Sequence, residues 1–219
     1  TNSSSKNNKV QIEKRLKEYK KKFPNGTPLV CACEKGHFKD VKLLITGYND
    51  VNGSNGNNNN NMTLKEYVNQ EGKDSHGYEY TPLMIAARNE HFQIVKYLIE
   101  QCEADPNIAN SSDGWNALHY AARNNKKDTK VIELLLTNMS LNSINKKTRW
   151  GSTPLDYAYY NHSSPIKQEI IALLRSKGGK ANYYDVNGRN VGPGNGNLNV
   201  RRHAVITGSD IEVVREALT

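Results

Sequence analysis

The stretch YTPLMIAARNEHFQIVKYLI, from Tyr80 to Ile99, carries the pattern that decides the fold. Thr81 is a helix-capping residue type, and Pro82 follows at the first helical position, where its missing N–H costs no hydrogen bond. The pair Ala86-Ala87 leaves room for another helix to approach closely. Apolar residues spaced three to four apart then make one stripe of a second helix, from Ile94 onward. The stretch therefore predicts two short helices in succession.

This pattern recurs along the chain, which makes it a structural repeat. The four matching segments are Gly26-Thr27-Pro28-Leu29, Tyr80-Thr81-Pro82-Leu83, Trp115-Asn116-Ala117-Leu118-His119 and Ser152-Thr153-Pro154-Leu155. Each is followed by small residues and then by a second apolar stripe. One helix pair cannot bury that stripe by itself, whereas stacked pairs bury it between them. The repeats therefore predict a solenoid.

Residues 25–182 resemble the ankyrin-repeat family in their Thr-Pro-Leu starts, Ala pairs and Gly36-His37 junction. The resemblance implies an all-α solenoid of stacked helix-turn-helix pairs with short β-hairpin turns. It also implies a protein–protein interaction module, an adaptor or scaffold that binds a partner protein through the concave surface of hairpin tips and inner helices. It implies no enzymatic activity, and we expect the chain to be a monomer.

Segments of different composition flank and interrupt the repeats. We expect residues 1–24 to form a basic N-terminal capping helix, 25–182 to hold repeats one to four, 183–199 to be a Gly/Asn-rich connector and 200–219 to be a degenerate fifth repeat. An Asn-rich insertion at about 53–73 interrupts the first repeat, and its low-complexity part predicts a loop. The connector is rich in turn-forming residues.

The second half of the insertion has a helix signal. Thr63 and Glu66 have capping-box spacing, which predicts a short helix. Two tripeptides, Asp50-Val51-Asn52 and Tyr67-Val68-Asn69, both resemble the residues that lead into a repeat hairpin. The sequence leaves open which of them does so.

Composition limits the class of protein. Apolar residues make up 36% of the chain and the mean hydropathy is -0.77, which argues against one deep core. No segment approaches the about 20 apolar residues that cross a membrane, and residues 1–5 have no apolar signal core. Cys31, Cys33 and Cys102 are too few and too irregularly spaced for a disulfide framework. We therefore expect a reducing compartment, cytoplasmic or nuclear.

The positive charge is concentrated at the N-terminus. Residues 1–25 carry +6 of the formal net charge of +8. Ile12, Leu16, Tyr19 and Phe23 have helical spacing, which favours a helix that covers the first repeat with its lysines in solvent. The alternative is an electrostatic binder of nucleic acid or anionic membrane, since clustered lysines bind phosphates. Salt titration separates the two interpretations.

Two sets of positions are candidate partner contacts, because their residues differ between repeats. One set lies in the turn before each helix start, and the other follows each Ala pair. Several of these residues are Arg, Tyr or Trp, the types that dominate binding hot spots. The predicted partner-binding residues are Tyr78, Tyr80, Arg88, Asn89, Trp115, Arg123, Asn124, Arg149, Trp150, Tyr160 and Asn161, and the same two sets include Glu34, Lys35, His76 and Asp113. We expect the aromatic residues to form a band, although packing on the neighbouring turn is an equal alternative for Trp115.

The histidines give no sign of a metal site or of acid–base catalysis. His37 and His91 lie at helix junctions, and His119 occupies a position that the family uses for structural hydrogen bonds. His76, His162 and His203 share no spacing that would bring them to one ion. The sequence contains no nucleophile motif, phosphate loop or dinucleotide fingerprint. We therefore expect no catalytic residues, no cofactor and no metal.

Overall fold

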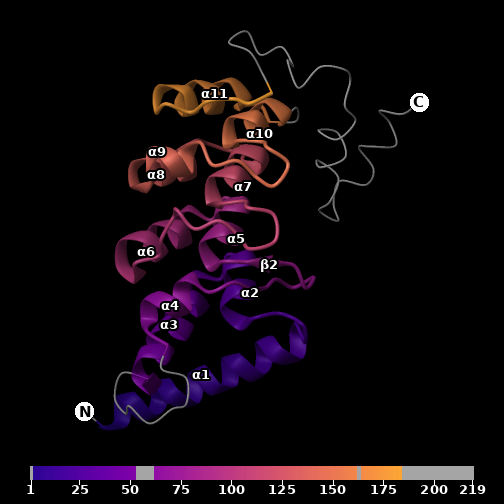
Figure 1. Ribbon diagram of the computed structural model, residues 1–219. Helices are drawn as coiled ribbons and strands as arrows, with labels where there is room; N and C mark the ends of the chain where they lie inside the picture. The colour runs from indigo at the N-terminus through magenta and orange to yellow at the C-terminus, as the bar shows by residue number, and fades with distance from the viewer. Residues whose placement is uncertain (1, 53–61, 162–163, 184–219) are drawn as a thin grey trace.

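The computed structural model describes residues 2–52, 62–161 and 164–183. In this part of the chain, short helices stack in pairs from one end of the molecule to the other (Figure 1). The two strands found there have two residues each. The predicted all-α solenoid with short hairpin turns is confirmed.

Four helix pairs make up the stack. The inner helices are α2 (Pro28–Glu34), α5 (Pro82–Arg88), α7 (Ala117–Asn124) and α10 (Pro154–Tyr160), and the outer helices are α3 (Phe38–Asn52), α6 (Phe92–Cys102), α8 (Lys130–Asn138) and α11 (Lys167–Ser176). Three further helices complete the described part: α1 (Asn2–Lys22), α4 (Leu64–Asn69) and α9 (Leu141–Ile144). Strands β1 (Gly72–Lys73) and β2 (Glu79–Tyr80) pair antiparallel, with Gly72 opposite Tyr80. Each inner helix packs on the next.

Side-chain caps start three of the four inner helices. The Thr81 hydroxyl accepts a hydrogen bond from the Met84 amide, and Asn116 and Thr153 accept equivalent bonds three residues on. Thr27 differs from the prediction, because it makes no such cap. Its hydroxyl instead accepts from the Lys73 amide at 3.0 Å. Thr27 therefore ties the first repeat to the first strand of the following hairpin.

Small residues allow the inner helices to approach one another. Ala86, Ala87, Ala121 and Ala122 are all fully buried. The outer helices contribute the larger side chains of the core, namely Ile94, Val95, Leu98, Val131, Ile132, Leu135, Ile170 and Leu174. The alternating small and large layers fill the space between repeats. This is the stacking that the recurring sequence pattern predicts.

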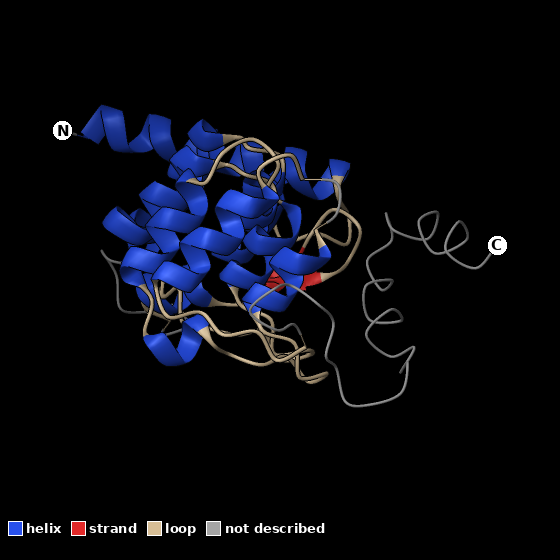
Figure 2. Ribbon diagram, turned by 90° about the horizontal axis from the view of Figure 1, so that it is seen from above, coloured by secondary structure: helices blue, strands red, loops and turns tan. Residues whose placement is uncertain are grey.

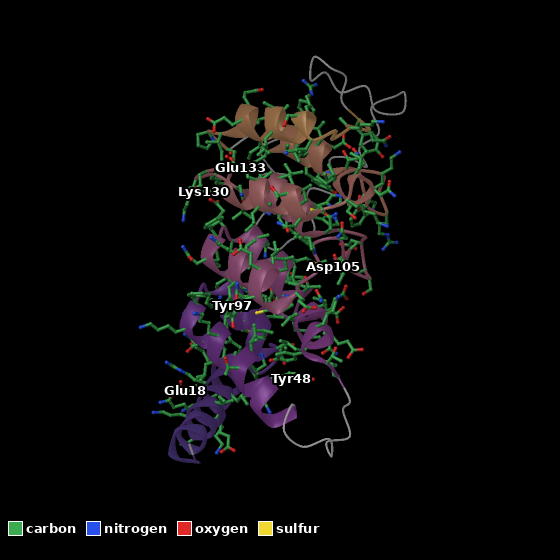
Figure 3. All side chains as sticks on the ribbon, turned by 90° about the vertical axis from the view of Figure 1, so that its left-hand side faces the viewer. Glu18, Tyr48, Tyr97, Asp105, Lys130 and Glu133 are labelled. Carbon is green, nitrogen blue, oxygen red and sulfur yellow. The ribbon has the colours of Figure 1, made fainter. Side chains whose placement is uncertain are left out.

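The second half of the insertion leads into the first hairpin. Thr63 and Glu66 form the predicted capping box at the start of α4. Tyr67 stacks on Tyr48 of α3 with ring centres 4.0 Å apart, which fixes α4 against the first repeat; Figure 3 labels Tyr48. Asn69 follows and accepts from the Asp105 amide at 2.8 Å. The segment 67–69 therefore precedes the hairpin, whereas residues 50–52 end α3.

Helix α1 packs on the first helix pair. Ile12 and Tyr19 are buried, and Leu16 and Phe23 pack partly buried against the same core. Gly47 of α3 makes this approach possible, since a Cβ there would lie 2.3 Å from the Cδ1 atom of Ile12. The predicted apolar stripe is therefore the face of α1 that contacts the repeats.

Some predictions fall on other parts of the chain. The Asn-rich run at 53–61, the connector after residue 183 and the fifth repeat at 200–219 lie outside the described residues. Their predicted organisation stays a prediction. Among the described helices, none is long and apolar enough to span a membrane.

Candidate partner-binding surface

Three hairpin loops project on the side of the inner helices, where they lie one above another along the stack. The first residues of the loops are Asp74, Asn110 and Thr148, and the carbonyl of each accepts a hydrogen bond from a glycine three or four residues later. These glycines, Gly77, Gly114 and Gly151, have positive φ angles. Figure 1 shows the inner and outer helices as two columns, and Figure 2 shows the loops beside the helices when the stack is seen from above. The inner helices and the loops form one surface.

Two aromatic residues that the sequence placed in an exposed band are in the core. Tyr80 is 3% exposed and Trp115 is 4% exposed. The Trp115 ring lies 4.1 Å from the ring centre of Tyr157 and 4.7 Å from that of Tyr120. Each large ring precedes its inner helix and packs between neighbouring repeats. The prediction that these two rings form a surface band is therefore wrong, and for Trp115 the packing alternative is confirmed.

The buried rings support arginines at the surface. The Arg88 guanidinium carbon lies 5.6 Å from the ring centre of Tyr80, and that of Arg123 lies 5.8 Å from Trp115. Arg88 also donates a hydrogen bond to the Tyr80 hydroxyl at 3.3 Å. Both arginines are half-buried. Cation–π contacts hold both guanidinium groups in place at equivalent positions of consecutive repeats, and the hydrogen bond adds to this for Arg88.

The asparagines next to these positions bond to backbone. Asn89 donates to the carbonyls of Ile85 and Glu34, and Asn124 donates to that of Tyr120. Asn161 is buried and donates to the carbonyls of Ala122 and Asn125 in the preceding repeat. Asn161 is therefore a link between repeats rather than a surface residue. This corrects its prediction as a partner contact.

The remaining predicted contacts reach the surface to different extents. Tyr78, at the tip of the first hairpin, is 48% exposed. Arg149 is exposed and lies over the Trp150 ring at 5.7 Å, while Trp150 itself packs partly against the core. The Trp150 carbonyl accepts a hydrogen bond from the Tyr183 hydroxyl. Tyr160 is half-buried at the end of α10. Their contact with a partner stays a prediction.

Three histidines have the structural roles predicted for them. His119 is fully buried, and its Nε2–H donates to the Lys146 carbonyl at 3.0 Å. Burial lowers the pKa of His119 to about 3, so its imidazole is neutral. His91 donates to the Glu34 carbonyl at 2.9 Å. His37 Nδ1 lies 2.7 Å from the Tyr19 hydroxyl, which joins α1 to the first repeat.

One group of polar side chains was missed by the sequence analysis. Glu34, Asp74 and His76 meet between the first inner helix and the first hairpin. Ser75 holds Glu34 there through its amide and its hydroxyl, at 2.9 and 2.7 Å. Although burial acts to raise the pKa of Glu34, hydrogen bonds from Lys35 and Ser75 lower it overall. The separation of about 40 residues hides this cluster in the sequence.

The comparison with protein families agrees with this architecture. The family model described as ankyrin repeats, in three copies, matches residues 3–110, 55–143 and 83–190. The overlapping matches extend from residue 3 to residue 190 of the 219 residues, and they include every helix pair described above. The four stacked helix pairs of the structure lie within these matched ranges. The chain belongs to the ankyrin-repeat family.

Proposed function

We propose that this chain is an adaptor that binds a partner protein through the hairpin tips and the exposed ends of its inner helices. Ankyrin repeats are in general protein–protein interaction modules rather than enzymes. We define the candidate surface by its exposed or half-buried members, which are Tyr78, Arg88, Asn89, Arg123, Asn124, Arg149, Trp150 and Tyr160. We propose that the adaptor is a cytoplasmic or nuclear monomer.

The observation that carries the proposal is the pair of arginines held on aromatic rings. Arg88 and Arg123 occupy the same position in consecutive repeats, each over a buried ring of its own repeat. A guanidinium that is already fixed loses little conformational entropy on binding. Arginine is also enriched among the residues that dominate binding energy. The surface is therefore preorganised for contact with a partner that offers hydrogen-bond acceptors.

Affinity capture with matched variants tests this proposal. The double variant Arg88→Ala/Arg123→Ala should lose the partner that the unaltered chain recovers. The control is Lys96→Ala/Lys130→Ala, which removes two exposed cations from the outer helices; Figure 3 shows Lys130 on that outer face. Equal recovery of the partner by both double variants would reject the surface. Because both variants lose the same charge, a difference between them is due to position.

A second function deserves a test because α1 exposes a row of cations. Lys14, Lys17, Lys20, Lys21 and Lys22 are all exposed. This row favours the alternative of electrostatic binding to nucleic acid or anionic membrane. Double-stranded DNA and vesicles containing phosphatidylserine are the two probes. Binding that weakens steeply with salt and disappears when these five lysines become Gln supports the alternative.

A further inference from the structure

Three metal-binding side chains converge between the first two repeats. Glu34 is the last residue of α2, and Asp74 and His76 belong to the loop between β1 and β2. One ligand atom of each lies within 4.8 Å of the others. His76 Nδ1 is 3.7 Å from Glu34 Oε1 and 3.9 Å from Asp74 Oδ2. Ligands at about 2.1 Å from a tetrahedral zinc lie about 3.4 Å apart, so small side-chain rotations bring these atoms to one ion.

The buried carboxylate of Asp74 has one oxygen that lacks a partner. Asp74 is 1% exposed, and its Oδ1 atom accepts from the amides of His76 and Tyr78, both at 2.9 Å. Its Oδ2 atom is buried and has no hydrogen-bond partner among the described residues. This oxygen is the one nearest the His76 imidazole. A buried anionic oxygen without a partner is costly, and a cation in the cluster would satisfy it.

In the next repeat, the side chain at the position of Asp74 has all its polar atoms hydrogen-bonded without an ion. Asn110 replaces Asp74 there, and its amide donates to the hydroxyls of Ser112 and Tyr120 at 3.1 and 3.3 Å. In the second repeat Ile85 stands at the position of Tyr120, four residues after the helix cap, and has no hydroxyl. The first hairpin therefore has a carboxylate, Asp74, where the next hairpin has an amide. It also lacks the tyrosine hydroxyl that bonds to that amide.

A lysine lies at one edge of the cluster. Lys35 Nζ is 2.8 Å from Glu34 Oε1 and 3.0 Å from the Ser75 hydroxyl. It therefore occupies an oxygen that a metal ion needs, although no described contact joins it to the orphan oxygen of Asp74. Lys35 is exposed, so its side chain can swing into solvent. Metal binding then replaces one cation at Glu34 by another.

We propose that Glu34, Asp74 and His76 bind a divalent transition-metal ion of the Zn²⁺ type, with water completing the coordination. An imidazole together with two carboxylates suits Zn²⁺, whereas Mg²⁺ and Ca²⁺ take oxygen ligands. Buried Cys31, Cys33 and Cys102 lie in the core and do not compete for the ion in the folded chain. The ion joins the end of α2 to the next hairpin, beside Tyr78. This site stands independently of the proposed partner.

Isothermal titration of the full chain with ZnCl₂ tests the site. His76→Ala should weaken Zn²⁺ binding at least about 100-fold, since even residues that only support metal ligands contribute roughly 10–100-fold. Asp74→Asn should weaken it similarly, and the fold already accommodates Asn at this turn, in Asn110. The control His37→Ala removes another histidine beside a carboxylate, 3.7 Å from Asp40, and should leave Zn²⁺ affinity unchanged.

Two further measurements make the result decisive. Lys35→Met should strengthen Zn²⁺ binding several-fold, because it removes the competing cation. Saturating Zn²⁺ should raise the melting temperature of the unaltered chain by about 5 °C, and EDTA should reverse the rise. His76 is 68% exposed, so His76→Ala should keep the metal-free melting temperature while losing the response to Zn²⁺. Binding of Mg²⁺ as tight as Zn²⁺, or Zn²⁺ binding unaffected by both His76→Ala and Asp74→Asn, would overturn the proposal.

Discussion

At the scale of single residues, one backbone position takes on different chemistry in each repeat. The seventh residue after the helix cap is Glu34 in the first repeat, Arg88 in the second, Arg123 in the third and Tyr160 in the fourth. Stacking places these side chains along one edge of the inner helices. Glu34 joins a polar cluster with the following hairpin, while the two arginines lie over aromatic rings. The repeat therefore fixes location, and the residue type decides the interaction.

Trp115 should matter for stability more than for binding. Trp115→Ala removes a buried ring that packs on Tyr120 and Tyr157, so we expect the free energy of unfolding to fall by about 3–5 kcal/mol. Urea unfolding followed by circular dichroism measures this change. Trp150→Ala is the comparison, because Trp150 is partly exposed and should cost less. A loss below about 1 kcal/mol for Trp115→Ala would contradict this packing of the Trp115 ring.

His119 should make the stability depend on pH. Its pKa in the folded state, about 3, lies below the ordinary value of 6.5, so the unfolded chain takes up the proton first as pH falls. The contribution of neutral His119 to the free energy of unfolding is therefore complete above about pH 7. It is lost as pH falls from 6.5 towards 3. At pH 5 the loss is about 2 kcal/mol relative to pH 7. His119→Gln, which retains a donor for the Lys146 carbonyl, should flatten the urea-midpoint profile between pH 7 and 5. An unchanged profile would reject this assignment.

Residue contacts between repeats were the hardest features to predict. The sequence shows that Tyr80 and Trp115 precede helix starts, but whether a ring points outward depends on the residues that the next repeat brings beside it. The Glu34, Asp74 and His76 cluster poses the same problem, because an insertion of undetermined register separates its members. In contrast, the cap at Thr81 could be predicted because all of its atoms lie within one helical turn.

At the scale of elements, local signals determined most of the fold. The Thr63 and Glu66 capping box predicted α4, and the apolar stripe from Ile12 to Phe23 predicted the contact face of α1. Both signals have the period of one helix and need no distant partner. The close approach of α1 to α3 could not be predicted, since it depends on Gly47 lying beneath Ile12. The sequence shows a glycine within a predicted helix, but it does not show which residue packs against that glycine.

Helix α1 should act as a structural cap of the first repeat. Removal of residues 1–24 exposes buried side chains of α2 and α3, so we expect partial unfolding or aggregation, measured by melting temperature and light scattering. Ile12→Asp should weaken the same contact because it places a carboxylate in the core. Lys17→Asp is the matched control, since it introduces the same side chain at an exposed position of α1. If Ile12→Asp melts at the same temperature as Lys17→Asp, α1 does not stabilise the stack.

In the molecule as a whole, the residues that stabilise the stack are different from those that we propose contact a partner. The outer helices and the Ala pairs fill the core, whereas the hairpin tips and the inner-helix ends carry the side chains that differ between repeats. Each repeat contacts its neighbours, so a change at one tip perturbs the rest of the stack weakly. Surface substitutions should therefore alter binding without abolishing the fold.

We expect the partner to contact the aromatic side chains of the hairpin loops on this surface. Tyr78→Ala removes an aromatic side chain from the tip of the first hairpin, where it is about half exposed. We expect it to weaken binding to the captured partner by roughly 2 kcal/mol, about thirtyfold, with an unchanged melting temperature. Trp150→Ala should weaken binding to a similar extent, with some loss of stability because Trp150 packs partly on the core.

Affinity and melting temperature must both be measured for these variants. The two measurements together distinguish a side chain that contacts the partner from one that stabilises the fold. Glu133→Ala is the control, since Glu133 is exposed on the outer face of α8, where Figure 3 labels it, and it should change neither quantity greatly. The aromatic contribution should also persist at high salt, since burial of apolar surface is not screened by ions as charge attraction is. Full affinity in both aromatic variants would instead place the partner elsewhere. The lysine row of α1 would then be the surface to substitute next, because its five lysines are all exposed.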